Sequence, residues 1–479
     1  MRRRGGLSAL FLLAAGACTA APPSSPSTSG ASVKRCHYDV QVASSNPLLL
    51  DVTADCVADG ALKFVASEPP ALPHLSDMFD GTGRALAVEG GGITVAASDD
   101  ATSTLRYRVN LDGVAQQAES FDVALRSGKS VVAPASTWLL RPEPHTARTE
   151  VTVDVHPGAD MSFATGLMRR DGHYRLGAHE VPVATYSVFG PRAERQLFVP
   201  GPAGTGQAEI AVAFADGALD VDVDVVTSWI ARSAAAVGEF WGGFPVSRAL
   251  VVVVPAPGRR GVGFGKVLPE SSPGIVLVIG EHSDAAALSA DWVLVHELFH
   301  LGFPSFQGEG KWLDEGLATY YEPIIRARAG NKSEADVWEE FVRAMPQGYT
   351  ALRTQGLEHT AAYRGIYWGG AVVSLLADLE ARKQSDGARG LEHGLRAILR
   401  AGGNASEVWS LEQSIHTCDT ALAAPVLAPL AERYAYRGSA VDLRPLWRQL
   451  GIEPVTGGVR LRDDAPMSKL RKAIVYGHP

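Results

Sequence analysis

Two short segments of the chain hold residues whose types and spacing suit metal chemistry. Residues 296–300 read His-Glu-Leu-Phe-His, so His296 and His300 are four positions apart, with Glu297 after the first. On a helix, positions four apart share one face, and both imidazoles would point the same way. Glu315 adds a carboxylate a short distance along the chain. Two histidines and one glutamate form a three-ligand zinc set that leaves a coordination position open, which predicts a hydrolase, most simply a peptidase.

Each of these residues has a distinct expected role. His296 and His300 would bind one zinc ion as neutral imidazoles, and Glu315 would be the third ligand. Zinc makes a bound water more acidic, and Glu297 beside that water would accept its proton as general base. Peptide hydrolysis also develops an oxyanion, which needs at least one further donor.

The surroundings of the motif argue against a chance match. By composition, an H-E-x-x-H string occurs in roughly one or two chains in a hundred of this length. The alternative is a core helix whose histidines are merely hydrogen-bonded. The neighbouring residues 292–295 and 298–299 are apolar, and burying two histidines and a glutamate among them costs free energy unless something pairs them. A metal ion would do so.

The segments before the motif predict a β domain. Short β-branched or alternating runs recur and are separated by Gly, Pro, Asn and Asp clusters; examples are 38–42, 104–109 and 149–155. A sandwich-like domain over residues 34–205 is therefore expected. Cys36 and Cys56 flank a predicted hairpin there and could form a disulfide in an oxidising envelope, whereas Cys418 is expected to be a buried thiol.

Helical periodicity begins after about residue 220. A helix is expected over 225–241, followed by buried strands at 249–254 and 274–279. Ser289 is expected to cap the histidine-bearing helix and Gly302 to end it. The domain carrying the metal ligands is placed at 206–330 and a mainly helical domain at 331–479. Further elements are expected at 311–329, 334–345, 369–382, 390–399, 424–435, 455–461 and 466–474.

The first residues have the features of a targeting segment. Three arginines at 2–4 precede an apolar stretch over 7–17 that is too short to cross a membrane. The sequence Ala-Gly-Ala before Cys18 resembles a bacterial lipoprotein cleavage box, with Cys18 as the lipidated residue. An ordinary secretory signal cut near Ala17 is the alternative. Residues 1–17 would be the signal peptide and 18–33 a Pro- and Ser-rich tether, which predicts lipid anchoring at the bacterial cell envelope.

Bulk composition limits the partners. The formal net charge of −8 argues against nucleic acid. The expected partners are a peptide or protein substrate and a membrane, the latter through the N-terminal lipid. Nothing in the sequence indicates an oligomeric state.

A family resemblance extends the predicted site. Residues 311–322 read KWLDEGLATYYE and resemble the W-L-x-E-G-x-A-x-Y-x-E stretch of gluzincin aminopeptidases. This resemblance implies that Glu315 is the third zinc ligand and that Glu322 lies beside a zinc-binding histidine. Residues 367–371, YWGGA, resemble the Y-x-K-G-A element that opens a helix in these enzymes. Its tyrosine donates to the oxyanion, which implies that role for Tyr367, with Tyr363 as the alternative.

The resemblance is closest to the glycyl aminopeptidase branch. It implies an α+β multidomain chain with an N-terminal β-sandwich-like domain, a thermolysin-like zinc catalytic domain and a C-terminal helical domain. It covers most of residues 35–450, although the specific motifs lie only within about 260–370.

One segment departs from the family pattern. Residues 261–266, Gly-Val-Gly-Phe-Gly-Lys, stand where relatives carry a glutamate-bearing strand that holds the free amine of the substrate, and no acid follows until Glu270. Gly263, Phe264 and Gly265 either form a mobile connection or belong to an edge strand that pairs with substrate backbone. The missing acid leaves exopeptidase and endopeptidase activity both open.

Two other functions remain alternatives. The chain could be a catalytically altered lipoprotein that uses this fold for binding or scaffolding. It could also be a zinc hydrolase that does not cleave peptides, because fold alone does not decide the reaction.

Overall fold

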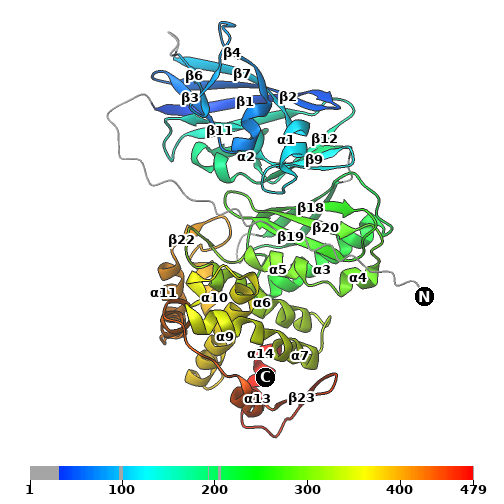
Figure 1. The fold of residues 1–479 in the computed structure, drawn as a ribbon, viewed down its shortest axis with the longest axis vertical. Helices are drawn as coiled ribbons and strands as arrows, with labels where there is room; N and C mark the ends of the chain where they lie inside the picture. Colours follow the sequence, from blue (N-terminus) through cyan, green and yellow to red (C-terminus); the bar gives the residue numbers. More distant parts are fainter. Residues whose placement is uncertain (1–31, 97–100, 192–193, 203–205, 478–479) are drawn as a thin grey trace, which may run out of the picture.

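The computed structural model describes residues 32–96, 101–191, 194–202 and 206–477. The molecule is elongated, with a β domain at one end, a second sheet in the middle and a helical region at the other end (Figure 1). The predicted α+β multidomain architecture is confirmed. The predicted signal peptide and Cys18 lie outside the described residues. Within them, no helix is both long enough and apolar enough to cross a membrane.

The N-terminal domain is built from three sheets. A seven-stranded sheet has the order β13-β14-β11-β1-β2-β7-β4, and two four-stranded sheets have the orders β10-β3-β6-β5 and β12-β15-β9-β8. The strands are β1 Val33–Ser45, β2 Leu48–Ala58, β3 Leu62–Ala66, β4 Leu75–Asp80, β5 Val88–Glu89, β6 Gly92–Val95, β7 Thr102–Asn110, β8 Leu125–Ser127, β9 Ser130–Pro134, β10 Leu140–Glu143, β11 Glu150–His156, β12 Ser162–Thr165, β13 Met168–Arg170, β14 His173–Gly177 and β15 Tyr186–Gly190. Helices α1 (Leu111–Ala118) and α2 (Ala135–Trp138), which the sequence did not predict, are inserted between strands.

The first hairpin shows how alternation forms this domain. Along β1, Tyr38 and Val40 are fully buried, whereas His37 and Asp39 lie on the opposite, partly exposed face. Cys36 stands directly opposite Cys56 on β2, and the two form the disulfide that the sequence left open. Cys418 is a buried free thiol, also as expected.

The middle layer is a five-stranded sheet with the order β16-β17-β18-β20-β19. Its strands are β16 Glu194–Pro200, β17 Gln207–Phe214, β18 Arg248–Ala256, β19 Val262–Leu268 and β20 Gly274–Gly280. The predicted domain boundary at 205/206 is therefore wrong, because β16 pairs along its whole length with β17. One face of this sheet packs on β9, β12 and β15 of the N-terminal domain through a separate apolar cluster that includes Val132, Tyr186 and Val252.

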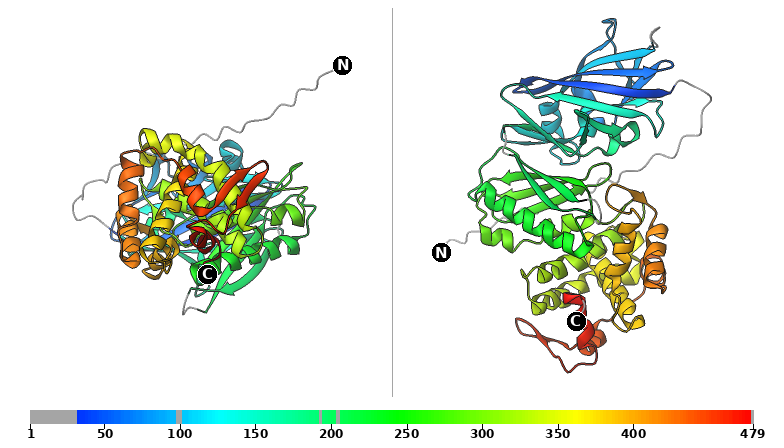
Figure 2. Two further views of the ribbon diagram at one scale, coloured as in Figure 1. Left: turned by 90° about the horizontal axis from the view of Figure 1, so that it is seen from below. Right: turned by 180° about the vertical axis from the view of Figure 1, so that it is seen from behind.

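Helices cover the other face of this sheet and fill the far end of the molecule (Figures 1 and 2). They are α3 Val223–Trp241, α4 Ala285–Ser289, α5 Val293–His300, α6 Lys311–Arg328, α7 Glu334–Ala344, α8 Tyr349–Thr354, α9 Tyr363–Gln384, α10 Leu391–Arg400, α11 Leu411–Leu422, α12 Leu427–Leu430, α13 Arg444–Leu450 and α14 Ser468–Tyr476. This region also contains two short pairs of strands: β21 Ser305–Phe306 with β22 Val408–Trp409, and β23 Ile452–Val455 with β24 Gly458–Leu461.

The predicted division at 330/331 does not separate two cores. One continuous apolar cluster extends from Val199 to Val475 and includes residues of both predicted domains. The helix α6, which carries Glu315, packs along α9 of the helical region. The part that carries the predicted metal ligands and the helical part are therefore one packed unit.

Three predicted helix starts and lengths differ from the structure. Ser289 ends α4 rather than capping α5; Asp291 instead accepts a bond from the Leu294 amide at 3.0 Å, at the start of α5. The helix α9 begins at Tyr363, so Tyr367 lies within its second turn and does not precede the helix. The expected helix over 424–435 is a short α12 followed by a π-helical segment over 431–436.

Candidate metal centre

The predicted metal ligands come from two consecutive helices, α5 and α6, and meet in the structure. His296 and His300 lie one turn apart on α5, and both side chains are buried. The Nε2 atoms of His296 and His300 lie 3.2 and 3.7 Å from the same oxygen, Oε2 of Glu315. One ligand atom from each residue lies within 4.8 Å of the other two. The three side chains that the sequence predicts as metal ligands therefore lie together in the structure.

The charges at this point fit a divalent cation. Glu297, Asp314 and Glu315 bring three carboxyl groups to two buried imidazoles. With neutral histidines, these carboxylates would leave an uncompensated negative charge in a buried place, which costs free energy. Zinc binds both imidazole nitrogen and carboxylate oxygen, and two imidazoles with one carboxylate are a ligand set that suits it. The donor set therefore fits the ion that the sequence predicts.

The second nitrogen of each histidine has a different environment. Asp314 Oδ1 lies 2.7 Å from His300 Nδ1, which fixes the ring and leaves Nε2 for a metal. His296 Nδ1 is buried and has no hydrogen-bond partner among the described residues. The His296 ring is instead held by aromatic contacts, stacked on Tyr367 and edge-on to Trp292.

Burial and the neighbouring charges act in opposite directions on the pKa values of this cluster. Burial raises the pKa of Glu297, and the two histidines oppose this rise. Burial alone would raise the pKa of Glu315, but the hydrogen bond from His296 and the charges of both histidines hold it below its usual range. Burial disfavours the charged ring of His300, yet Asp314 and Glu315 outweigh burial and raise its pKa.

Glu297 lies between α5 and the strand β19. Its Oε2 accepts a bond from the Val267 amide at 3.1 Å, which aims the carboxylate along the edge of the sheet. The close approach depends on Gly265: a Cβ there would come within 2.5 Å of Val293 Cγ1 and 2.8 Å of Glu297 Cγ. A glycine at 265 therefore lets β19 lie against the helix that carries Glu297.

Replacing Gly265 with alanine is expected to lower the free energy of unfolding by about 1–3 kcal/mol, because the new methyl group overpacks this contact. The matched variant Gly263→Ala changes the same residue type in the same strand, where nothing lies within 4 Å of the added Cβ. Its effect should stay within about 0.5 kcal/mol. Denaturant unfolding of both variants checks this; equal destabilisation would contradict the packing described here.

The glycine-rich segment forms a strand, β19, at the edge of the sheet. β19 pairs with β20 on one side only and ends the sheet, with a register shift at Gly263. The Val267 amide points away from β20, toward Glu297, so the backbone of Gly265, two residues earlier, faces the same free edge. The Phe264 ring lies on the other face and stacks on Phe121 of the N-terminal domain, with ring centroids 5.3 Å apart. The free edge is thus available for pairing next to Glu297.

Tyr367 lies beside the three ligands. Its ring is parallel to that of His296, with 5.6 Å between centroids, and its hydroxyl interacts with Glu315 and Tyr363. Burial raises the pKa of Tyr367 and the Glu315 charge raises it further, so the phenol remains a hydrogen-bond donor. The alternative residue, Tyr363, is exposed and lies one turn earlier, with 4.0 Å between the two ring centroids.

Two glycines fix the position of Tyr367 relative to Glu315. The helices α6 and α9 touch at Gly316 and Gly370, where a Cβ on Gly316 would lie 2.4 Å from the Gly370 backbone. The two glycines belong to the segments that resemble the aminopeptidase motifs. Their role in the structure is to let the two helices approach backbone to backbone.

The placement expected for Glu322 is wrong. Its Oε1 accepts a hydrogen bond from Arg326, one turn later on α6, at 3.0 Å, whereas His296 and His300 contact Glu315 and Asp314 instead. Arg326 also donates to the Ala290 carbonyl just before α5. Burial raises the pKa of Glu322 to about 8, and Arg326 opposes that rise. Glu322 thus supports the packing of α6 against the start of α5, while Asp314, which the sequence analysis missed, contacts His300.

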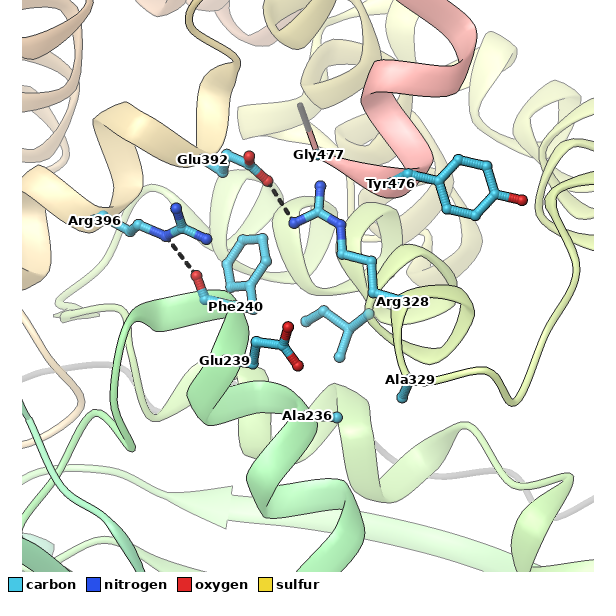
Figure 3. A pocket seen from close by; sticks show the side chains of 10 residues that line it. Ala236, Glu239, Phe240, Arg328, Ala329, Glu392, Arg396, Tyr476 and Gly477 are labelled. Atoms are coloured by element: carbon cyan, nitrogen blue, oxygen red, sulfur yellow. Dashed lines mark hydrogen bonds and ion pairs between the residues drawn. The ribbon is translucent and has the colours of Figure 1, made fainter. Parts of the chain in front are cut away.

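A separate hollow lies at the other end of α6 (Figure 3). It is lined by residues of α3, α6, α10 and α14 and has a volume of about 230 Å³. Its two arginines are already engaged: Arg328 pairs with Glu392 at 2.8 Å and Arg396 donates to the Phe240 carbonyl. Thirteen helical positions separate Arg328 from Glu315, which is about 20 Å. The hollow is therefore separate from the α5–α6 site and takes no part in the chemistry assigned to that site.

Comparisons with known proteins agree with this architecture. No protein-family model and no curated protein matches the sequence. Among solved structures, an aminopeptidase N family protein from Idiomarina loihiensis has a TM-score of 0.66 at 14% identity, over 87% of this chain and 78% of that chain. An M1 zinc metallopeptidase from Deinococcus radiodurans has a TM-score of 0.51 at 16% identity, over 86% of this chain and 95% of that chain.

A third structure, a two-domain M1 zinc metallopeptidase bound to L-arginine, has a TM-score of 0.53 at 16% identity, over 86% of this chain and 96% of that chain. At these identities the likeness concerns the fold. This chain therefore has the multidomain fold seen in M1 zinc metallopeptidases.

Proposed function

We propose that this protein is a zinc-dependent peptidase. The observation that supports this most strongly is the meeting of His296, His300 and Glu315 at one point, with Glu297 beside them along a free strand edge. A metal ligand set, a general base and a surface for an extended backbone are the three parts that peptide hydrolysis by a metal-activated water needs.

Each side chain contributes a defined step. Nε2 of His296, Nε2 of His300 and the Glu315 carboxylate would hold zinc, which when bound supplies Lewis acidity toward water and the substrate carbonyl. Glu297 would accept a proton from the attacking water at the oxygen not bound by Val267 and pass it to the leaving amine. Tyr367 would donate its hydroxyl proton in a hydrogen bond to the developing oxyanion.

The free edge of β19 would bind the substrate in an extended conformation. The Gly265 backbone offers an N–H and a C=O next to Glu297, and main-chain pairing there would place a peptide bond near the base. The exposed rings of Trp292 and Tyr363 lie on either side of His296 and its neighbour Tyr367 and provide apolar surface for substrate side chains.

A panel of peptides tests this function and its specificity. β19 has no acidic residue, and Glu270, the next acid along the chain, accepts a bond from Ser305 instead. We therefore expect amine-blocked peptides to be cleaved at rates comparable to those of free-amine peptides. Cleavage of free-amine peptides alone would establish an aminopeptidase. No hydrolysis of any peptide by the zinc-loaded protein would contradict the proposal and favour a binding role or another zinc hydrolase reaction.

Replacing Tyr367 with phenylalanine is expected to lower kcat about 100-fold, because one oxyanion donor is lost. KM and zinc content should change little, since the ring that stacks on His296 is kept. Tyr363→Phe is the matched control, and its kcat should stay within about tenfold of the parent. Steady-state kinetics of the two variants decides the assignment: a larger loss in Tyr363→Phe would transfer the role to that residue.

We also propose that the protein is anchored at the bacterial envelope through a lipid on Cys18. The support is the sequence alone: the arginines at 2–4, the apolar stretch over 7–17 and the small residues before the cysteine. Incorporation of labelled fatty acid during expression in bacteria tests this. Label should be present in the parent and absent from Cys18→Ser; equal labelling of both would contradict lipidation at this residue.

A further inference from the structure

A second group of metal-binding side chains lies on the N-terminal domain. His37, Asp154 and His173 come from β1, β11 and β14, which are adjacent in the seven-stranded sheet. One ligand atom from each of them lies within 4.8 Å of the other two. Figure 1 shows β1 and β11 at the opposite end of the molecule from α9, so this group is separate from the centre on α5 and α6.

The register of the sheet explains this meeting. On β1, β11 and β14, the residues of the opposite parity, such as Tyr38, Val153 and Leu176, are buried in the domain core. His37, Asp154 and His173 therefore share the outer face of the sheet. Their side chains are 39%, 26% and 43% exposed, so a metal ion from solvent can reach them.

His37 contacts a hydroxyl on one side and a carboxylate on the other. Its Nδ1 lies 3.0 Å from Thr152 Oγ1, which also contacts the Cys36 carbonyl at 3.4 Å, and its Nε2 lies 3.6 Å from Asp154 Oδ2. In the tautomer whose Nδ1–H donates to Thr152, the Nε2 lone pair faces the carboxylate, and a cation between these two acceptors would satisfy both.

The other side of the carboxylate is also occupied by an imidazole. His173 Nδ1 lies 2.8 and 2.9 Å from the two oxygens of Asp154, and the His37 and His173 rings are edge-on with 5.7 Å between centroids. Ligands around a zinc ion are bonded at about 2.0–2.2 Å and so lie roughly 3–3.5 Å apart. Small rotations of these side chains would reach that spacing.

The neighbouring charges favour a cation at this place. Asp39 stands opposite Asp154 on β1, so two carboxylates are adjacent on the outer face. The nearest arginine on β14, Arg175, is paired with Glu150 and Asp171. His156 pairs with Asp39 at 3.0 Å, next to the three-residue group. Two further charged residues border the group: Asp55 stands opposite His37 on β2, and Arg170 stands opposite His173 on β13. With neutral imidazoles, Asp39, Asp55 and Asp154 therefore outnumber the one arginine directly opposite a member of the group.

We propose that His37, Asp154 and His173 form a second, solvent-accessible binding site for a divalent transition metal ion. Imidazole and carboxylate ligands suit zinc, and also copper and nickel. A bound ion would connect three strands, including the parallel pair β1 and β11, which join distant parts of the sequence. The site would thus stabilise the N-terminal domain and keep one coordination position open to solvent.

Zinc content after equilibrium dialysis of the full chain in micromolar zinc tests this proposal. The parent is expected to hold one more equivalent of zinc than the double variant His37→Ala/His173→Ala. Asp154→Asn keeps the size of the side chain and is expected to bind that equivalent at least tenfold more weakly. His156→Ala is the matched control, an exposed histidine paired with an aspartate on the same face, and should match the parent. The comparison does not depend on the centre at α5 and α6, whose occupancy is read separately from His300→Ala.

Thermal unfolding gives a second readout. In the His300→Ala background, zinc at about a hundredfold excess over its Kd should raise the Tm of the N-terminal domain by roughly 5 °C, and the rise should vanish in His37→Ala/His173→Ala. Equal zinc content in the parent and the double variant would overturn the proposal. A loss in His156→Ala as large as that in the double variant would overturn it as well, because binding would then not depend on the three-residue geometry.

Discussion

Replacing Glu297 with glutamine is expected to lower kcat for peptide hydrolysis by about 1,000-fold while leaving the zinc content unchanged. The amide keeps the size of the side chain but cannot accept a proton from water, and a positioned general base contributes about 10²–10⁴ in rate. The binding of zinc should persist because the proposed ligands are His296, His300 and Glu315, which the substitution leaves in place. Metal analysis and steady-state kinetics on the same preparations measure both quantities.

Glu270→Gln is the matched control for this variant. Glu270 is a half-buried glutamate whose pKa is also raised by burial, but it contacts Ser305 and lies outside the group of metal ligands. Its kcat should stay within a few-fold of the parent. If Glu297→Gln hydrolysed peptides as fast as the parent, the proposed mechanism would be wrong, whatever the metal content.

Removing a metal ligand should have the second large effect. His300→Ala takes away one of the three proposed ligands, and we expect zinc affinity to fall by more than the roughly 100-fold that loss of an orienting partner can cost, and peptide hydrolysis to be lost. Asp314→Asn leaves all three ligands and removes only the carboxylate that orients His300, 2.7 Å from its Nδ1. Loss of such a partner costs about 10–100-fold in metal affinity. Competition with a chelator gives the two affinities.

The graded order of the two variants is the informative result. Loss of a ligand lowers zinc affinity more than loss of the residue that orients it. His300→Ala should therefore lower zinc affinity far more than Asp314→Asn, and excess zinc should restore activity only to Asp314→Asn. Equal loss in both variants would mean that Asp314 is itself a ligand. Unchanged affinity in His300→Ala would mean that zinc binds elsewhere.

The site on α5 and α6 could be predicted because its signals are local. The relation between His296 and His300 depends on one helical turn, and the apolar residues around them indicate burial. The segment around Glu315 carries its own motif. What that motif could not show is which carboxylate touches which histidine, because this depends on how α6 crosses α5. Asp314 stands next to Glu315 in the sequence, yet its contact with His300 became evident only in the structure.

The features that the sequence analysis missed have two origins, non-local strand pairing and one local ion pair. The alternating pattern of β16 resembles that of the preceding strands, and only its pairing with β17 assigns it to the five-stranded sheet. For Glu322, the arginine one turn later at Arg326 was a local signal that competes with the family motif. His37 and Asp154 are far apart in the sequence and meet through a parallel pair, which no local pattern indicates.

Diffraction data collected on both sides of the zinc absorption edge, from crystals of the zinc-loaded full chain, test the central claim most directly. The account predicts an anomalous peak contacted by Nε2 of His296, Nε2 of His300 and the carboxylate of Glu315, with Glu297 beside it and not bound to it. No peak between these residues, or a peak that lacks one of the three ligands, would contradict it.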